Sequence, residues 1–408
     1  MSDVLAVNIG SSSVKFALYT VVDALHVEEA HVSGLIEGLE PSGRPRLSVK
    51  ADGAVREKIL EAAKPPRSNM EVALEALKDL LLEVLKGRPL VAVAHRIVHG
   101  GDVFCEPVVL GEPALSALER LCPLAPLHQP HNLAGVRACR AAFPEVPQVG
   151  CFDTAFHKTM SELESHFGLP RSFYAEGVRR YGFHGLSYEY ISTRLMRRSE
   201  AAQGRLLMAH LGSGSSLCAA VKGLSQASSM GFSALDGLLM GTRSGSIDPG
   251  VLLYLLAEGW TADRIGRLLY KESGLLGVSG ISADMRRLRD SNSPDAHFAI
   301  ELYAHRVIRE AGALIAVMGG LDAIAFTGGI GEHDAALRAS VCEGLAHLGV
   351  RLLPEANAQA RGSETLPIQD PASSAEVWVI PTDEGRVAAE SALRALKSDR
   401  RHDLPLQL

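Results

Sequence analysis

Apolar runs of strand length, each closed by glycine or polar residues, recur along the chain. The first run, residues 4–7, predicts a buried strand, and a second strand is predicted at residues 14–19, after a turn of Gly10 and three serines. Residues 21–60 predict the rest of a small sheet with a variable loop. Four later runs also predict buried strands, at residues 90–94, 146–152, 322–327 and 377–380.

Apolar residues at helical spacing lie between these runs. Ser68 and Glu71 have the spacing of a capping box and begin a helix whose leucines continue to Gly87. Pro294 predicts the start of a long helix that ends near Gly319. Further helices are predicted at residues 134–142, from Ser187, from Thr261 and at residues 386–397. Strands that alternate with helices in this way predict an α/β fold.

The first predicted hairpin recurs half a chain later. Residues 8–13, Asn-Ile-Gly-Ser-Ser-Ser, align without a gap over residues 210–215, His-Leu-Gly-Ser-Gly-Ser, in a chain of 408 residues. Similarity at half the length indicates duplication of a domain-sized unit. Both turns offer backbone N–H groups and hydroxyls suited to phosphate oxygens. Two-domain ATPases of the actin, Hsp70 and sugar-kinase type are similar, and this resemblance implies two ribonuclease H-like domains facing a nucleotide cleft.

Composition narrows the class of protein. The formal charge of −6, the absence of a long basic run and an aromatic content of 5% do not favour nucleic-acid binding. Six scattered cysteines, without a Cys-x-x-Cys pair, predict neither a zinc site nor a disulfide framework. Asp3 stands where a signal peptide would be basic, and no apolar stretch reaches the ~20 residues of a membrane helix. A cytoplasmic protein without a membrane partner is therefore expected.

Two glycine-rich segments in the second half predict contact with a ligand, and the second has a nucleotide-binding arrangement. Residues 241–245 place Arg243 among glycines, where backbone and guanidinium can both approach a ligand. Residues 328–333 follow a predicted strand and open a helix, an arrangement whose free N–H groups can meet an anion or a ribose.

Taken together, the motifs resemble those of the acetate kinases, within the short-chain acyl kinases that also act on propionate and butyrate. The matching segments follow the family's order over nearly the whole chain, at residues 8–15, 95–101, 125–128, 152–157, 181–185, 240–245, 279–286 and 326–332. The resemblance implies Mg²⁺-dependent transfer of the γ-phosphoryl group of ATP to acetate, with Mn²⁺ as an alternative ion. It also implies a homodimer formed through the second domain.

The chemistry of acyl phosphate formation explains the residue types at the matching positions. Two anions must meet, so Arg96 and Arg243 would clamp the carboxylate and the transferring phosphoryl group. His184 would donate to an equatorial oxygen of the transition state. Acetate is already ionised at neutral pH, so Asp153 is interpreted as an orienter, although the family is often described with this residue as the acid/base. Replacing either arginine with alanine should then slow turnover without moving the unfolding temperature.

The resemblance also assigns binding residues. Asn8 and Glu384 correspond to the magnesium positions. The acyl pocket would be lined by Val98, Leu127, His128, Phe183 and Ala234, together with Arg96. ATP or ADP would be held by Lys15, His210, Leu211, Gly212, Ser213, Gly214, Asp284, Met285, Arg286, Gly329, Ile330, Gly331, Glu332 and His333.

These assignments divide the chain into two predicted domains. Residues 1–150 would form the acyl-substrate and phosphate-hairpin domain, with the helix at 386–408 packing back on it. Residues 151–385 would form the nucleotide-binding and dimerisation domain.

Five positions depart from the family pattern. Ser213 stands for Asn, Ala227 and Ser246 for Asp, Gly385 for a second Glu, and Ala234 for Pro. The first four bear on nucleotide affinity and metal geometry, and the last on the depth of the acyl pocket.

Other interpretations remain open on the residues alone. Arg96 could be a structural ion-paired arginine, and His128 and His210 could be hydrogen-bonded structural histidines. Asp153 and Glu384 could serve only as turn or cap residues. A propionate or short-chain acyl kinase is the alternative activity within the family. A sugar kinase would need an Asp base beside a hydroxyl, and an actin-like filament protein would have no reason to hold Arg96, His184 and Arg243.

Overall fold

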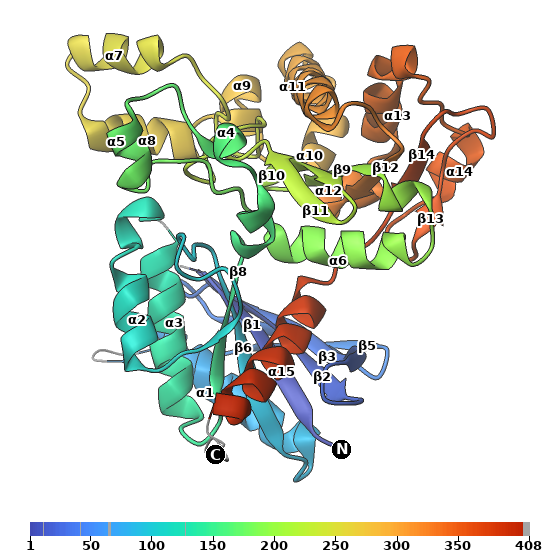
Figure 1. Ribbon diagram of the computed structural model, residues 1–408. Coiled ribbons are helices and arrows are strands. Elements are labelled where there is room, and N and C mark those ends of the chain that lie inside the picture. The colour runs from blue at the N-terminus through green and yellow to red at the C-terminus, as the bar shows by residue number, and fades with distance from the viewer. Residues whose placement is uncertain (11, 41, 64–66, 127, 403–408) are drawn as a thin grey trace, which may run out of the picture. The chain divides into compact units, whose positions relative to one another are not determined.

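Each of the two predicted hairpins begins a mixed β-sheet in the computed structural model of the protein (Figure 1). The structure describes residues 1–10, 12–40, 42–63, 67–126 and 128–402. The chain divides into unit 1, Met1–Ala155 with Asp383–Leu408, and unit 2, Phe156–Thr382. The sequence placed these boundaries at 150/151 and 385/386.

Unit 1 is built on a sheet with the strand order β5-β4-β3-β2-β1-β6-β8-β7. Strands β1 to β5 form an antiparallel meander, whereas β6 and β8 run parallel to β1. The strands are β1 (Asp3–Ile9), β2 (Ser13–Val21), β3 (Val27–Glu37), β4 (Arg46–Ala51), β5 (Ala54–Ile59), β6 (Leu90–Ile97), β7 (Val108–Val109) and β8 (Gln148–Phe152).

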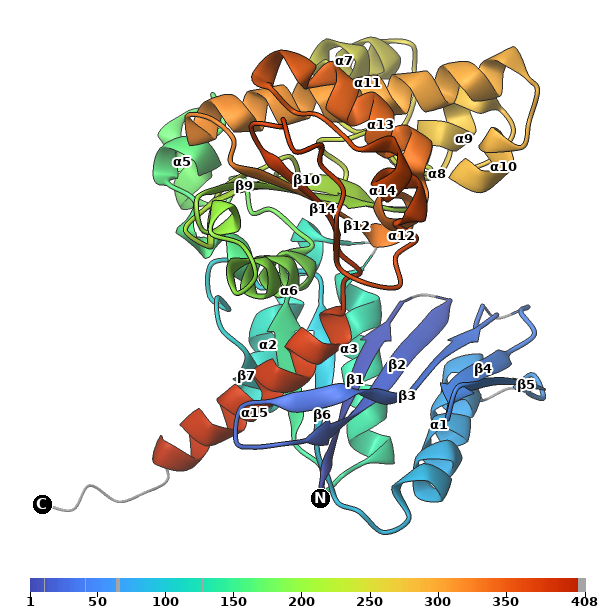
Figure 2. The same ribbon diagram turned by 90° about the vertical axis from the view of Figure 1, so that its right-hand side faces the viewer.

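Helices cover both faces of the unit 1 sheet. Helices α1 (Asn69–Leu85), α2 (Glu112–Glu119) and α3 (Gln129–Ala142) pack on one face, and α15 (Glu384–His402) crosses the other against β1, β6 and β8 (Figure 2). The capping box at Ser68 and Glu71 is confirmed at the start of α1. Helix α3 begins five residues earlier than predicted because Pro130 lies in its first turn, where proline is tolerated.

Unit 2 repeats the same plan. Its sheet has the order β11-β10-β9-β12-β14-β13, with β9 to β11 antiparallel and β12 and β14 parallel to β9. The strands are β9 (Arg205–Leu211), β10 (Ser215–Val221), β11 (Leu224–Ser228), β12 (Ala323–Thr327), β13 (Leu366–Pro367) and β14 (Glu376–Val379).

Side chains that alternate along β9 and β10 separate two cores in unit 2. Leu207, Ala209, Leu217 and Ala219 face the long helix α11 (Pro294–Met318), and the intervening residues face α6 (Gly185–Met196). The other helices are α4 (Glu162–Ser165), α5 (Arg171–Ala175), α7 (Pro249–Ala257), α8 (Ala262–Lys271), α9 (Gly274–Ser279), α10 (Met285–Arg289), α12 (Gly328–His333), α13 (Ala335–Gly344) and α14 (Pro354–Gln359).

The two sheets share a core of five strands with one topology, so the predicted duplication is confirmed. In both, three antiparallel strands are extended on the first of them by two parallel strands, and unit 1 adds β4 and β5 to the antiparallel side. The hairpin turns differ by one residue, because Ile9 pairs with Val14 whereas Leu211 pairs with Ser215. The ungapped alignment of the two motifs therefore holds only as far as the turn. No described helix is long and apolar enough to cross a membrane.

Candidate active site

Three predicted site residues of unit 1 lie at one level on one face of its sheet. Val7 pairs with His95 in the parallel β1–β6 register, so the next residues, Asn8 and Arg96, lie on neighbouring strands at the same height. Lys15 is directly opposite Asn8 across the β1–β2 hairpin. Residues in register point to the same face, and this is the face that α15 crosses.

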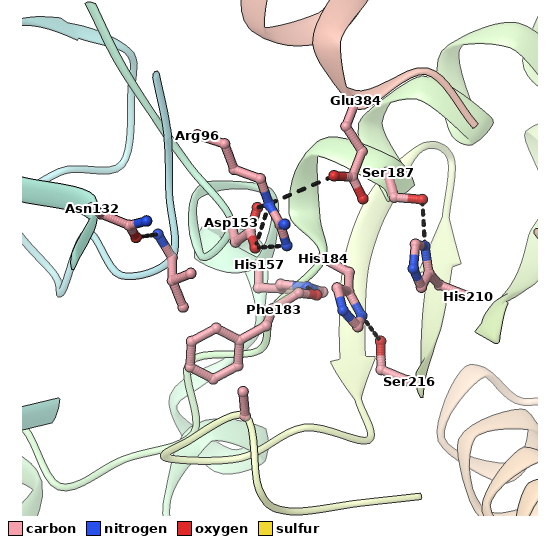
Figure 3. Close-up of polar contacts among 12 residues, drawn as sticks. Arg96, Asn132, Asp153, His157, Phe183, His184, Ser187, His210, Ser216 and Glu384 are labelled. Carbon is pink, nitrogen blue, oxygen red and sulfur yellow. Dashed lines mark hydrogen bonds and ion pairs between the residues drawn. The ribbon is translucent and has the colours of Figure 1, made fainter. Parts of the chain in front are cut away.

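Arg96 is held by two carboxylates in unit 1 (Figure 3). Its Nε and Nη2 donate to Asp153 at 3.0 and 2.6 Å, and Glu384 Oε2 lies 3.6 Å from Nε. Asp153 follows the end of β8, where its backbone N–H donates to the carbonyl of Ile97. The pair is bidentate, and this geometry fixes the plane of the guanidinium.

Burial and charge oppose each other in this cluster. Burial raises the pKa of Asp153 above its usual value, and the guanidinium of Arg96 acts in the opposite direction. Burial alone would lower the pKa of Arg96, but the carboxylates of Asp153 and Glu384 raise it. Arg96 is therefore a permanent cation. Both oxygens of Asp153 accept from Arg96, so this carboxylate holds the guanidinium in one orientation.

A tyrosine on β2 holds the first turn of α15, where Glu384 lies. Tyr19 donates to Asp383 Oδ1 at 2.6 Å, and the same oxygen accepts from the backbone N–H of Arg386. A Cβ at Gly385 would lie 2.4 Å from the Tyr19 hydroxyl. The departure at Gly385 thus leaves room for this contact.

Asn132 is a unit 1 residue that sequence reasoning missed. Its Nδ2 donates to the carbonyl of Ile9 at 2.8 Å. Its Oδ1 accepts from the N–H of Val98 at 3.1 Å (Figure 3). It therefore ties the ends of β1 and β6, beside Asn8 and Arg96. The only sequence signal was a second polar residue at helical spacing from Gln129, which donates to the carbonyl of His99. His128 lies at the start of α3, and Leu127 lies outside the described residues.

The unit 1 donors suit a hydrated magnesium ion rather than a caged one. Within the described parts of the chain, no three His, Cys, Asp or Glu side chains come together as a metal cluster. Asn8 and Glu384 instead offer oxygen ligands beside a face that also carries Lys15 and Arg96. Mg²⁺ commonly keeps several waters and binds through one or two protein oxygens plus substrate phosphates. The residues present fit that mode.

In unit 2, two histidines stack at the start of the second hairpin. The rings of His184 and His210 lie 4.2 Å apart, at 23° to each other. His184 Nδ1 is 2.8 Å from Ser216 Oγ, and His210 Nδ1 is 2.8 Å from Ser187 Oγ (Figure 3).

His184 itself has a left-handed backbone, with φ of 58°. The other described non-glycine residues with positive φ lie at exposed turns or at a helix end, whereas His184 directly precedes buried helix α6. His157 supports this segment, since its Nε2 is 2.9 Å from the carbonyl of Phe183. Backbone strain that the surroundings maintain is common at functional sites.

Arg243 lies beside the same hairpin turn. A Cβ on Gly214 would be 3.4 Å from His184 Nε2 and 3.8 Å from Arg243 Nη1. The same Nη1 donates to the carbonyl of Ala234 at 2.8 Å. Unit 2 therefore brings together three of the predicted site residues, His184, Gly214 and Arg243, and the backbone of Ala234 anchors the arginine.

The predicted ATP-binding residues of unit 2 fall into two groups, those on glycine turns where backbone segments approach closely and those whose side chains are buried in the core. The turn at Gly212 approaches Gly329, whose N would be 3.8 Å from a Cβ at 212, and Gly241 N donates to Ser213 O at 3.1 Å. Glycines at these positions let backbone segments approach closely. Leu211 and Met285, by contrast, bury their side chains in the core.

The acidic and basic residues in these motifs have local partners. Glu332 accepts from Gly328 N and so stabilises the glycine turn. Asp284 caps α10 and pairs with Arg286, which is exposed. Arg338, which sequence reasoning missed, is fully buried and donates to the carbonyls of Gly331 and Glu332. No signal in the sequence distinguished it from a surface arginine.

The contacts of two more positions that differ from the family pattern are visible in the structure. Ser246 donates to Asp236 at 2.7 Å and closes the loop that carries Arg243. Ala227 is fully buried on β11, where it packs in the core. Nothing in the described contacts explains Ser213.

Comparisons with known proteins match nearly the whole length of this chain. The model of the acetokinase family matches residues 3–390. A protein of Rhodopseudomonas palustris called acetate kinase is 47% identical over 412 aligned positions, which cover 98% of this chain and 100% of that protein.

Solved structures give the same result. Porphyromonas gingivalis acetate kinase is 36% identical, with a TM-score of 0.85 over 97% of this chain and all of the other. A propionate kinase from Francisella tularensis is 37% identical, with a TM-score of 0.87 over 96% of this chain and 99% of that one.

Proposed function

The chain belongs to the acetokinase family, and from this we infer that it is a kinase whose phosphoryl acceptor is a carboxylate. We propose that it reversibly transfers the γ-phosphoryl group of ATP to acetate, giving acetyl phosphate and ADP by direct in-line displacement. The observation that carries this proposal is a family match over residues 3–390 together with the guanidinium of Arg96, which Asp153 holds in one orientation. Such a group suits the binding of a carboxylate or phosphoryl anion.

Unit 1 would supply the anion clamp and the metal ligands. Arg96 binds the acetate carboxylate, and Asp153 keeps the guanidinium in one plane. Because acetate is already ionised, the reaction needs no general base. Asp153 can therefore remain paired with Arg96 and need not accept a proton from the substrate. Asn8 and Glu384 hold Mg²⁺, mostly through water, and Mn²⁺ can replace it. When bound, the ion neutralises charge on the ATP phosphates.

Unit 2 would stabilise the transferring group. Arg243 and His184 donate to oxygens of the phosphoryl group as charge develops on them, which is the largest single source of catalysis in many enzymes. Within unit 2, the backbone at Gly212, Ser213 and Gly214 cradles the ATP phosphates together with His210. Within unit 1, Lys15 is the proposed phosphate ligand. The segments 284–286 and 329–333 serve the adenosine end.

Trapping of the product as a hydroxamate tests this proposal directly. Acetyl phosphate formed from ATP, Mg²⁺ and acetate reacts with hydroxylamine and gives a coloured ferric complex. Signal that depends on acetate and on ATP supports a carboxylate kinase. Turnover of ATP with a sugar hydroxyl and no hydroxamate would indicate a sugar kinase, and nucleotide binding without turnover would indicate a filament protein of the actin type.

The magnesium placement predicts a specific defect. Glu384→Ala should raise the magnesium concentration needed for half-maximal rate and lower turnover, because a ligand oxygen is lost. The measurement is a magnesium titration at fixed ATP, with Glu390→Ala as the control, since Glu390 lies on the same helix and pairs with Arg386. An unchanged titration in Glu384→Ala would exclude this placement and make Asp153 the leading candidate.

Residue 234 should set which carboxylic acid the enzyme prefers. Alanine at 234 is smaller than proline, so the wall of the acyl pocket should retreat, and one methylene is worth about 1–3 kcal/mol in such a pocket. Propionate should therefore be used within about tenfold of acetate in kcat/KM, and butyrate should remain poor. The test compares the three acids in the native enzyme and in Ala234→Pro. Proline keeps the carbonyl that accepts from Arg243, so the arginine retains its anchor. An unchanged propionate-to-acetate ratio would show that residue 234 does not set the depth.

The exposed apolar surface of α7 supports a homodimer formed through unit 2. Leu253, Tyr254 and Leu256 are 68%, 62% and 50% exposed, and none of the helix is buried within its own unit. We expect the protein to sediment at about twice its mass of 43.5 kDa. Leu253→Glu should shift it to the monomer, whereas Leu224→Glu, at an exposed leucine on β11, should not. A native protein of 43.5 kDa in solution would contradict the dimer.

The proposed partners are otherwise small molecules: acetate or acetyl phosphate, and ATP or ADP. We place the enzyme in the cytoplasm, where these metabolites and reduced cysteines are found. The six cysteines are free in the structure.

A further inference from the structure

A serine on β10 links His184 to a buried tyrosine. Ser216 Oγ lies 2.8 Å from His184 Nδ1 and 2.5 Å from the hydroxyl of Tyr188 on α6. Ser216 and Tyr188 are both fully buried. The neighbouring residue Ser215 points to the opposite face, where it meets Tyr303 of α11 at 2.8 Å. Alternation along the strand thus gives two adjacent serine–tyrosine pairs, and the serine of the first pair contacts His184.

The direction of the hydrogen bonds follows from the proton of Tyr188. Burial raises the pKa of Tyr188 well above its usual value, so the phenol keeps its proton. Among the described residues, the acceptor for the phenol proton is Ser216 Oγ. Because a buried hydroxyl whose hydrogen bond is not made is destabilising, Tyr188 donates to Ser216.

The Ser216 hydroxyl must then donate its own hydrogen bond to another acceptor. A hydroxyl carries a single donor, and the remaining partner of Ser216 in the described structure is His184 Nδ1. Nδ1 therefore accepts, and in the neutral ring the proton sits on Nε2. A proton on Nδ1 would leave the buried Ser216 hydroxyl without an acceptor.

The protonated nitrogen is the one that faces the phosphate turn. A Cβ on Gly214 would lie 3.4 Å from Nε2, on the side where Arg243 Nη1 also approaches. The left-handed backbone of His184 helps to direct Nε2 toward this turn, because it sets the direction of the side chain at the start of α6.

We propose that Tyr188 and Ser216 are positioning residues that fix the Nε2–H tautomer of His184, so that a neutral imidazole donates to the transferring phosphoryl group. The role of that donor rests on the proposed function, whereas the tautomer does not.

Nitrogen NMR measures the tautomer in the full-length resting enzyme. With ¹⁵N-labelled histidine, long-range proton–nitrogen correlations distinguish the protonated from the bare ring nitrogen, and His184→Asn assigns the signal. The native enzyme should show Nε2 protonated. Tyr188→Phe should give a mixture of tautomers, since Ser216 can then accept as well as donate, and Ser216→Ala should do the same. A native ring protonated on Nδ1, or a tautomer unchanged in both variants, would overturn the proposal.

Tyr303→Phe is the matched control. It removes the same buried hydroxyl from the other pair, next to Ser215, so a loss of packing or stability should be similar. The His184 signals should keep their native pattern in this variant. If they change as much as in Tyr188→Phe, the effect is a general loosening of the sheet and the proposal fails.

Kinetics separate this proposal from the proposed function. Tyr188→Phe should lower kcat by about tenfold, less than the hundredfold typical of losing a donor outright, with KM values nearly unchanged. A lost tautomer with normal kcat would contradict the donor role of His184 while the hydroxamate assay still reports the acyl kinase. A lower kcat with an intact tautomer would overturn the positioning role.

Discussion

Alanine at position 243 is expected to lower kcat by about a hundredfold, ~3 kcal/mol of transition-state stabilisation, and to leave the unfolding temperature nearly unchanged. The guanidinium of Arg243 donates to the carbonyl of Ala234 at 2.8 Å and contacts Met240 Sδ at 3.6 Å. Both are neutral groups, so the substitution leaves no buried charge behind at these contacts. Losing these two neutral contacts should cost little stability, so the larger effect is expected on the reaction.

Two other variants make this prediction sharp. Arg243→Lys keeps the charge but loses the planar fork, so it should recover only part of the rate. Arg205→Ala removes another unit 2 arginine, which pairs with Asp322 at 2.6 Å, and it should affect stability without a comparable fall in kcat. Initial rates and thermal unfolding of the three variants decide the matter. Near-normal turnover in Arg243→Ala would contradict the proposed mechanism.

The strand ends were the most predictable part of the site. Buried parallel strands are read from short apolar runs, and polar residues at their carboxyl ends must gather at one edge of the sheet. This logic placed Arg96 and Asp153 after successive strands, and the structure joins them as an ion pair. The repeat of the hairpin motif half a chain later predicted the second unit, whose sheet contains the β9–β10 hairpin.

Contacts between distant segments were beyond the sequence. Asn132 reaches Ile9 across 123 positions, and Ser216 meets Tyr188 across 28. No spacing rule connects such pairs, because their proximity depends on how helices pack on the sheet. The start of α3 was also missed, since a proline in a first turn was interpreted as the end of a loop.

The contribution of individual arginines to the stability of the fold could not be predicted from the sequence either. From sequence alone, Arg96 and Arg243 carried the same expectation, a slower reaction with an unchanged unfolding temperature. The structure separates them, because Arg96 neutralises Asp153, whose side chain is only 2% exposed. Arg338 shows the opposite extreme, an arginine that is fully buried among carbonyls and the amide of Asn357.

Replacing Arg96 with alanine should therefore cost both activity and stability. Turnover should fall by about a hundredfold or more, as expected for a preorganised electrostatic group. The free energy of unfolding should also fall, by about 3–5 kcal/mol, since removing one partner of a buried pair strands the other charge. Chemical denaturation monitored by circular dichroism gives the second quantity.

A double variant separates the two losses. Arg96→Met with Asp153→Leu removes both charges and fills the space with apolar groups, an exchange that is often neutral or stabilising for buried pairs. The double variant should recover most of the stability that Arg96→Ala loses, while its turnover stays at the level of the single variant. Recovery of turnover along with stability would mean that Arg96 acts only through the fold. If neither recovers, the Arg96–Asp153 pair is not the source of the instability, and Glu384, 3.6 Å from Arg96 Nε, becomes the group to test.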